Sequence, residues 1–259
     1  MAPSTMRQLS CLALALGLLF VGVRQATATL IHGSENVSGR RDTARYTYNG
    51  KSYGPFGWDY SYIRSFDGTK LTKHVEVDFL FDAGLGWGDA EKAAYKAGIE
   101  SGIEAIWNGQ YSIRDNGTGL LYPLTVDVAT TGPFNQVVVL HPGDGPTNLY
   151  NWYENDTYVI NAHEFGHMLG LYDEYLPGAI DQYPNPTLSS DGLMGLGALD
   201  PDPVFYPRYF QQYLDYLVQL NPTESFSLVQ VPEPATWLLL VVGLACLAAK
   251  RRLGSRACR

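Results

Sequence analysis

The chain has 259 residues, a formal net charge of −8 and 17% charged side chains. The two terminal segments hold seven of the 18 basic residues but only one of the 26 acidic residues, so the part between them is more acidic still, and such a surface is a poor partner for nucleic acid. All three cysteines, Cys11, Cys246 and Cys258, also lie in the terminal segments. A disulfide framework and a thiolate metal site are therefore excluded from residues 29–230.

The N-terminal segment, residues 1–28, has the pattern of a secretory signal peptide. Arg7 precedes an apolar run over residues 9–23, and the small residues 26–28 offer a cleavage site near Ala28. Residues 29–70 are rich in Gly, Tyr, Ser and Asp and show no sustained helical period. We expect them to be an irregular lead-in, or a propeptide, before a single main domain over residues 71–230.

That domain is predicted to alternate strands and helices. The alternation in "KHVEVDFLFD" (73–82) predicts a half-buried strand. Residues 87–109 predict a helix with Asp89 as its N-cap and with Asn108-Gly109 at its end. Two further strands are expected in 121–130 and 135–143.

A polar stretch follows at 144–157, and we expect an exposed edge strand within residues 149–157, on which a peptide could lie. After a helix near residue 158 come a Pro/Gly/Asp-rich loop (177–207) and a last helix (207–220) with a stripe of Phe210, Leu214, Leu217 and Val218. The predicted class is α/β (α+β), with a twisted mixed sheet above the site helix and a loop-and-helix lower part.

The stretch "HEFGHMLGLYDEY" carries the chemistry. His163 and His167 are four residues apart, so on a helix both imidazoles project from one face and can bind one metal ion. Glu164 lies one step round the helix, where a base acting on a water held by the metal is needed.

A catalytic zinc site needs a third protein ligand and one open position. Gly170 can adopt the left-handed conformation that ends a helix and turns the chain back. A carboxylate that follows this turn could complete the site, and Asp173 and Glu174 are both candidates.

These residues resemble the HExxHxxGxxD form of the metzincin zinc endopeptidases. The resemblance favours Asp173 over Glu174 as third ligand, Glu164 as catalytic base, zinc as cofactor and a zincin-like fold. It also implies a methionine turn beneath the metal, for which Met194 in "SSDGLMGLG" is the candidate.

The sequence departs from the better-known members of that family in two ways. No cysteine is available for a latency switch, and no tyrosine stands two places after Met194 to stabilise a reaction intermediate. Tyr206 and Tyr209 are weak substitutes that we interpret as packing residues. The single histidines His32, His74 and His141 are interpreted as surface or strand residues, and the loop aspartates lack the regular spacing of a calcium loop.

The C-terminal segment, residues 231–259, combines Pro232-Glu233-Pro234 with an apolar run over 235–249 and the basic cluster Lys250, Arg251 and Arg252. Physically this is a short membrane span with a cytoplasmic positive end. It resembles a PEP-CTERM sorting signal, which implies recognition by an exosortase and export to the surface or matrix of a Gram-negative bacterium, with transient anchoring in the inner membrane.

The sequence thus predicts an exported zinc endopeptidase that acts on proteins or peptides. The alternative is a surface or matrix protein in which a zinc ion only stabilises the fold.

Overall fold

The computed structural model describes residues 30–133, 135–179 and 188–232. The predicted signal peptide and nearly all of the predicted sorting segment, including the apolar run 235–249, lie outside these ranges. Within them, no helix is long and apolar enough to cross a membrane.

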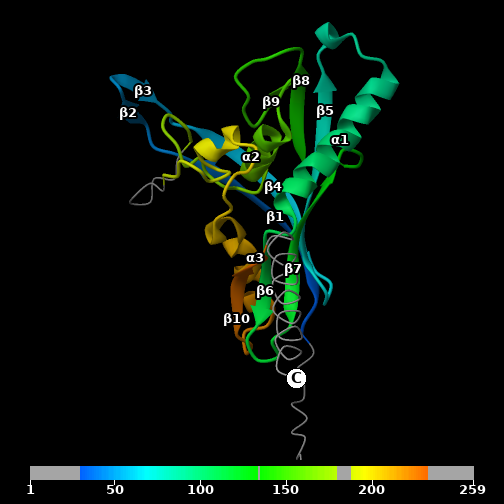
Figure 1. Cartoon of the computed structure of the whole chain (residues 1–259), viewed down its shortest axis with the longest axis vertical. Coiled ribbons are helices and arrows are strands. Elements are labelled where there is room, and N and C mark those ends of the chain that lie inside the picture. The colour runs from blue at the N-terminus through cyan, green and yellow to red at the C-terminus, as the bar shows by residue number, and fades with distance from the viewer. Residues whose placement is uncertain (1–29, 134, 180–187, 233–259) are drawn as a thin grey trace, which may run out of the picture.

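The described chain forms an eight-stranded mixed sheet, a two-stranded hairpin and three α-helices with short 3-10 turns (Figure 1). In chain order the elements are β1 (Gly33–Asp42), β2 (Tyr46–Tyr48), β3 (Lys51–Tyr53), β4 (Gly57–Phe66), β5 (Leu71–Phe81), η1 (Ala83–Leu85), α1 (Asp89–Trp107), β6 (Tyr111–Asp115), β7 (Leu121–Ala129), β8 (Gln136–His141), β9 (Asn151–Tyr153), α2 (Tyr158–Met168), η2 (Leu196–Leu199), η3 (Pro207–Phe210), α3 (Gln211–Leu220) and β10 (Phe226–Gln230).

Strand β5 is the centre of the sheet. Its residues alternate between buried and partly exposed, as the sequence period predicts. Its first half, residues 71–76, pairs in parallel with β7, and its second half, residues 77–81, pairs in parallel with β8. The sheet therefore divides at β5 into a lower part with β7, β6 and β10 and an upper part with β8 and β9 (Figure 1).

Residues 33–66 differ from the irregular lead-in that the sequence suggested. They form the ten-residue strands β1 and β4, which pair antiparallel along their whole length and join the main sheet through β5. The three buried side chains of β4, Trp58, Tyr62 and Phe66, are spaced by four residues, so polar residues between them hide the strand period. β1 lies at the sheet edge and carries almost no large apolar side chain, so its stability comes from the backbone pairing.

Helix α1 packs against β7 and α2, with Ile99, Ile103 and Trp107 buried. It begins one residue earlier than predicted, with Gly88 as N-cap, and the Glu91 carboxylate accepts the Gly88 N–H at 2.6 Å. The two helices can approach closely because residue 102 is a glycine. A Cβ at this position would lie only 2.5 Å from the Tyr158 ring. This contact fixes the start of the helix that carries the histidines.

The lower part contains more strand than expected, because β6 and β10 pair antiparallel beside α3. The last helix begins as a 3-10 turn at Pro207, and its buried face is Phe210, Tyr213, Tyr216 and Leu217. Val218, assigned to that face from the sequence, is 40% exposed. The rings of Tyr213 and Tyr216 thus form part of the buried face, where the sequence indicated aliphatic side chains beside Phe210.

One charged side chain, Lys73 of β5, lies in this core. Its Nζ donates to Gln212 Oε1 at 3.0 Å and lies over the rings of Tyr62 and Tyr213, 4.9 and 4.5 Å from their centroids. Burial, aided by repulsion from nearby arginines, lowers the pKa of Lys73 to about 7.

Lys73 should make stability depend on pH. Between about pH 7 and the ordinary lysine pKa of 10.5, the unfolded chain binds a proton at this position that the folded protein has released, so the free energy of unfolding should rise with pH. From pH 7 to pH 9 the wild type should gain about 2 kcal/mol more than the Lys73→Met variant. Urea unfolding of both proteins at the two pH values measures this difference, and an identical pH dependence would contradict it.

Candidate metal centre

The helix that carries the histidines, α2, is buried on almost all sides. Nine of its eleven residues are buried. Its N-cap is Thr157, whose side chain accepts the Ile160 N–H. Its last residue is Met168, and Gly170, two residues further on, has a φ of 79° in the left-handed region, as its position in the motif indicates. The N–H groups of Gly170 and Leu171 close the helix by donating to His167 and Gly166 carbonyls.

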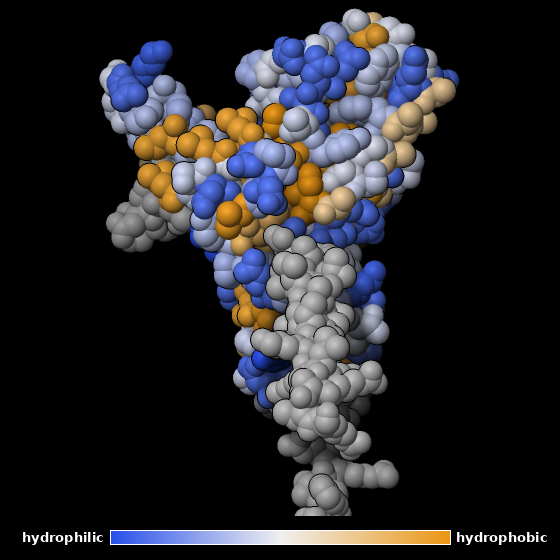
Figure 2. All heavy atoms as spheres, viewed as in Figure 1, coloured by the Kyte–Doolittle hydropathy of each residue, from blue (hydrophilic) through white to orange (hydrophobic). Residues whose placement is uncertain are grey.

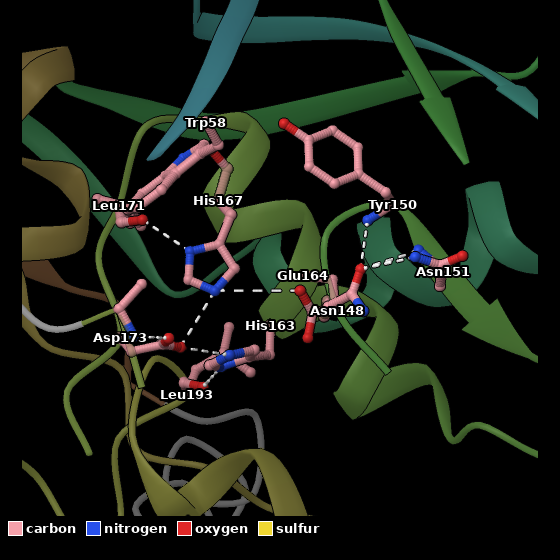
Figure 3. Close-up of polar contacts among 12 residues, drawn as sticks. Trp58, Asn148, Tyr150, Asn151, His163, Glu164, His167, Leu171, Asp173 and Leu193 are labelled. Carbon is pink, nitrogen blue, oxygen red and sulfur yellow. Dashed lines mark hydrogen bonds and ion pairs between the residues drawn. The ribbon is translucent and has the colours of Figure 1, made fainter. Parts of the chain in front are cut away.

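Three side chains converge beside this helix (Figure 3). Asp173 Oδ1 lies 3.0 Å from His163 Nε2 and 3.1 Å from His167 Nε2, and all three ligand atoms lie within 4.8 Å of one another. Ligand atoms placed tetrahedrally about 2 Å from a zinc ion lie about 3.3 Å apart. His163, His167 and Asp173 thus form a buried group that could hold a metal ion.

The orientation of both imidazoles fits this role. His163 Nδ1 lies 2.7 Å from the Leu193 carbonyl oxygen, and His167 Nδ1 lies 2.8 Å from that of Leu171. A carbonyl only accepts, so both Nδ1 atoms carry protons, and each ring in its neutral form presents an Nε2 lone pair to the common point. Asp173 Oδ1 is itself buried, and no described residue donates to it with normal hydrogen-bond geometry. Three acceptors that face each other require a cation, either a metal ion or a proton, between them.

The charges of the site follow from the same arrangement. Burial favours the neutral Asp173 carboxyl, yet the two imidazoles outweigh it and hold the pKa of Asp173 far below its ordinary value. Burial would lower the pKa of His167, but the Asp173 carboxylate raises it to about 9. The pocket therefore binds one positive charge tightly, and a divalent cation would displace the proton.

Asp173 reaches the site through the turn that Gly170 begins. Its backbone N–H donates to the Ala179 carbonyl at 2.9 Å, and its Oδ2 accepts the Ala179 N–H. A Cβ at position 178 would lie 2.7 Å from the Asp173 carboxylate, so a glycine there allows the loop to close. These contacts fix the carboxylate before any ion binds.

Glu174, the competing candidate, lies in a different network. Its carboxylate accepts from Arg208 Nε and Nη2, at 2.5 Å each, from Ser189 Oγ at 2.8 Å and from the Tyr209 hydroxyl at 2.9 Å. These contacts tie the loop after α2 to η3. With its oxygens already bonded, Glu174 is not a member of the converging group.

Glu164 lies beside the group, with Oε2 4.0 Å from His167 Nε2. Burial raises the pKa of this carboxyl, against the opposing effect of His167 and His163. Two cavities, of about 380 and 290 Å³, reach Glu164, and both are also lined by Thr147 and Tyr175. Glu164 and Tyr175 therefore stand where the two cavities adjoin.

Tyr175 was not singled out from the sequence. It lines both cavities together with Glu164, and its ring lies 6.0 Å from that of His163. Burial, followed by the charges of Asp173 and Glu164, raises the pKa of the phenol above its ordinary value, so it stays protonated as a donor. The sequence feature that could have identified Tyr175 is its position two residues after Asp173.

The weaker tyrosine candidates lie elsewhere. The Tyr209 hydroxyl donates to Glu174, and the Tyr206 hydroxyl donates to Asp191 Oδ1 at 2.7 Å.

Met194 is fully buried, and its thioether fills the space that a side chain at Gly166 would need. It therefore packs directly beneath α2, next to Leu193, whose carbonyl orients His163.

The β1–β4 ribbon also reaches the site. Trp58 Nε1 donates to the His167 carbonyl at 3.0 Å, and its ring meets the His167 ring edge-on at 5.4 Å. Arg41 Nε donates to the Gly170 carbonyl at 2.8 Å. Both side chains satisfy carbonyls at the C-terminal end of α2, so residues 30–66 stabilise the site helix.

The expected edge strand is present as β9, which pairs in parallel with β8. The backbone N–H and C=O groups of Asn151 exchange hydrogen bonds with those of Asn148, and the Tyr153 N–H donates to Asp156 Oδ2. The strand edge is thus already paired within the chain. The segment just before it, Thr147–Tyr150, is the one that lines the larger cavity.

Comparison with known proteins adds one finding. Residues 230–252 match the family model of the PEP-CTERM protein-sorting motif. This motif implies an exported protein, sorted to the cell surface of a Gram-negative bacterium and processed by an exosortase. Neither the curated proteins nor the solved structures include a match to this chain.

Proposed function

We propose that this protein is an exported zinc endopeptidase with His163, His167 and Asp173 as metal ligands and Glu164 as catalytic base. The observation that carries the proposal is the convergence of three lone-pair donors on one point, beside a carboxylate that faces two cavities. The donor set of two imidazoles and one carboxylate fits zinc.

When bound, zinc would polarise the scissile carbonyl and lower the pKa of the attacking water. Glu164 takes a proton from that water as its oxygen attacks the carbonyl carbon, and passes the proton to the nitrogen as the C–N bond breaks. Tyr175 donates its hydroxyl proton in a hydrogen bond to the oxygen that becomes negative. His163 and His167 are held in place by the carbonyls of Leu193 and Leu171.

The cavities favour cleavage inside a peptide chain. They extend from Glu164 in two directions, so a substrate can continue on both sides of the bond that is cut. Large hydrophobic residues near the site are exposed, among them Leu188, Leu196 and Leu199 at 51–78%. Hydrophobic side chains also gather across the middle of the face in Figure 2, which suits contact with protein substrates.

The test uses the full chain, purified in detergent and loaded with zinc, with casein as substrate. We expect cleavage that a chelator abolishes and added zinc restores. A protein that binds one equivalent of zinc but cleaves neither casein nor a peptide library would contradict the proposal.

The alternative, a zinc ion that only stabilises the fold, is favoured by the deep burial of all three ligands, which are 3–6% exposed. A structural zinc site is closed by four protein ligands, whereas the described residues supply three and a cavity leads to the fourth side. In that alternative, metal removal would lower the melting temperature of a protein without peptidase activity.

Tyr175→Phe separates the two functions further. Loss of one hydrogen-bond donor to a developing oxyanion should lower kcat by roughly 10²- to 10³-fold. Zinc affinity should stay close to that of the wild type, because the phenol is not a ligand. Steady-state kinetics and zinc titration measure both quantities, and an unchanged kcat would remove Tyr175 from the mechanism.

A further inference from the structure

A third cavity, which we call the β4–β8 cavity, lies between the β1–β4 ribbon and β8. Strand β4 pairs with β1 along its whole length but with β5 only over residues 63–66, and β8 pairs with β5 from Val77 onward. β4 and β8 do not pair with each other, and a cavity of about 540 Å³ is lined by residues 59–61 of β4 and residues 135–137. Tyr150 lines this cavity as well as the larger of the two cavities at Glu164, so one side chain borders both spaces.

The most informative residue of the lining is Gln136, the first residue of β8. It is 7% exposed, and none of the described residues hydrogen-bonds its side-chain amide. The amide atoms are nevertheless not among the fully enclosed polar atoms of the described chain, so they keep access to open space. A buried amide without a partner lowers the stability of the fold, because its bonds to water are lost and not replaced. This side chain therefore indicates a ligand that can both donate to the amide and accept from it.

Three hydroxyl groups of the same lining are also free. They belong to Ser38 of β1, Ser61 of β4 and Tyr150, and none of them has a partner among the residues that the structure describes. Ser38 and Ser61 are opposite each other in the β1–β4 pairing. In Figure 3 the Tyr150 hydroxyl takes part in none of the contacts drawn. Each hydroxyl can donate one hydrogen bond and accept two, so a ligand would meet polar partners from several elements of the fold.

The charge of the lining argues against an ionic ligand. Asp59 is the only charged residue among the described residues that line the cavity, and its carboxylate lies 3.4 Å from Arg40 Nη1. The described lining contains no lysine, arginine or histidine that could pair with a phosphate, sulfate or carboxylate. A single carboxylate that already has a cationic neighbour is also a poor site for a cation. The lining thus fits a neutral polar ligand.

A sugar ring matches these features. Its hydroxyl groups lie all around the ring and both donate and accept, whereas an extended peptide backbone presents polar groups along two edges only. The C–H groups of the ring can pack on an aromatic face, and Tyr150 offers a ring that is 46% exposed. The cavity volume lies within the roughly 300–1,000 Å³ of small-molecule sites, which suits a short saccharide.

We propose that the β4–β8 cavity binds a neutral saccharide, with Gln136, Ser38 and Ser61 as hydrogen-bonding groups and Tyr150 as the stacking surface. This binding requires neither the metal nor hydrolysis. Because Tyr150 also lines the cavity at Glu164, the saccharide would lie next to the candidate metal centre. A sugar attached to a substrate protein and a free polysaccharide share this chemistry.

The test uses the full chain, purified in a detergent without a sugar headgroup and titrated calorimetrically with saccharides. The probes are neutral oligosaccharides of glucose, galactose, mannose and N-acetylglucosamine, with a sulfated oligosaccharide for comparison. At least one neutral probe should bind, and the sulfated probe should bind more weakly. Failure of every neutral probe to bind, or binding of the sulfated probe alone, would overturn the proposal.

Two variants test the lining. Gln136→Leu should weaken binding of the neutral saccharide on the order of 10-fold, because the hydrogen bonds to the amide are lost. Without saccharide this variant should melt at no lower temperature than the wild type, since leucine has a similar size and leaves no amide unpaired. Tyr150→Ala should weaken binding roughly 3- to 10-fold, and it should fold normally because the ring is half-exposed.

Gln110→Leu is the matched control. The Gln110 amide donates to the Ile106 carbonyl at 2.9 Å and does not line the cavity, so this variant should bind the saccharide as the wild type does. Wild-type affinity in both Gln136→Leu and Tyr150→Ala would place the saccharide elsewhere and overturn the assignment of the site.

A further comparison separates the two sources of saccharide. The Glu164→Gln protein is titrated with a peptide that carries one Ser-linked sugar and with the same peptide without it. Tighter binding of the glycopeptide indicates a sugar on the substrate, whereas equal binding of both peptides, with the free saccharide still bound, indicates a polysaccharide. If no saccharide binds and unmodified peptides lose affinity in Gln136→Leu, the cavity is a peptide site and the proposal is wrong. The saccharide titrations involve no cleavage, so failure of the peptidase proposal would leave this one standing.

Discussion

Glu164→Gln is expected to lower kcat for peptide hydrolysis by roughly 10²- to 10⁴-fold, the usual contribution of a general base. Glutamine keeps the size of the side chain but cannot take a proton from water. Glu164 is not among the converging ligands, so the variant should still bind one equivalent of zinc. Steady-state kinetics on a casein-derived peptide, with metal content measured on the same sample, test both parts.

Glu224→Gln, on the surface loop before β10, is the matched control and should have wild-type kinetics. A Glu164→Gln protein that retains full activity and bound zinc would exclude Glu164 as the base. A protein that loses the metal together with activity would instead make Glu164 a ligand.

Asp173→Asn is expected to weaken zinc binding by more than about 100-fold, because loss of a ligand should exceed the 10- to 100-fold typical of residues that only orient ligands. The amide is similar in shape but lacks the negative charge that balances the ion. Isothermal titration with zinc measures the affinity directly.

Glu174→Gln is the comparison that separates the two neighbouring carboxylates. This side chain bonds Arg208, Ser189 and Tyr209, so its loss of charge should lower the melting temperature without changing zinc affinity. The opposite pattern, zinc lost in Glu174→Gln and kept in Asp173→Asn, would reverse the assignment of the third ligand.

The part of the site that the sequence predicts is the part set by local geometry. His163, Glu164 and His167 take their places from helical spacing, and Gly170 from its freedom at positive φ. These features involve residues close together in the chain. The meeting of Asp173 with the two histidines follows from the same short turn.

The parts that the sequence did not predict depend on contacts between distant residues. Trp58 meets His167 across 109 positions, and Arg41 meets the Gly170 carbonyl across 129. Strands β1 and β4 escaped recognition because β1 carries almost no large apolar side chain and the buried side chains of β4 are four residues apart, so neither shows the strand period. Neither the periodicity nor the composition of a sequence indicates which distant residues will be in contact.

Tyr175 illustrates a third case. Its position after Asp173 was visible, but nothing in one sequence says that this side chain lies beside Glu164 and His163, where the two cavities adjoin. The loop closure at Ala179 places it there. The same closure forms a wall of the larger of the two cavities at Glu164, so the position of Asp173 and the shape of that cavity depend on one loop.

X-ray absorption spectroscopy at the zinc edge, on the purified protein loaded with one equivalent of zinc, tests the central claim most directly. The account predicts two imidazole nitrogens and one carboxylate oxygen in the first coordination shell, with imidazole scattering reduced in His163→Ala and in His167→Ala. A shell without imidazole, or a spectrum that neither substitution changes, would contradict it.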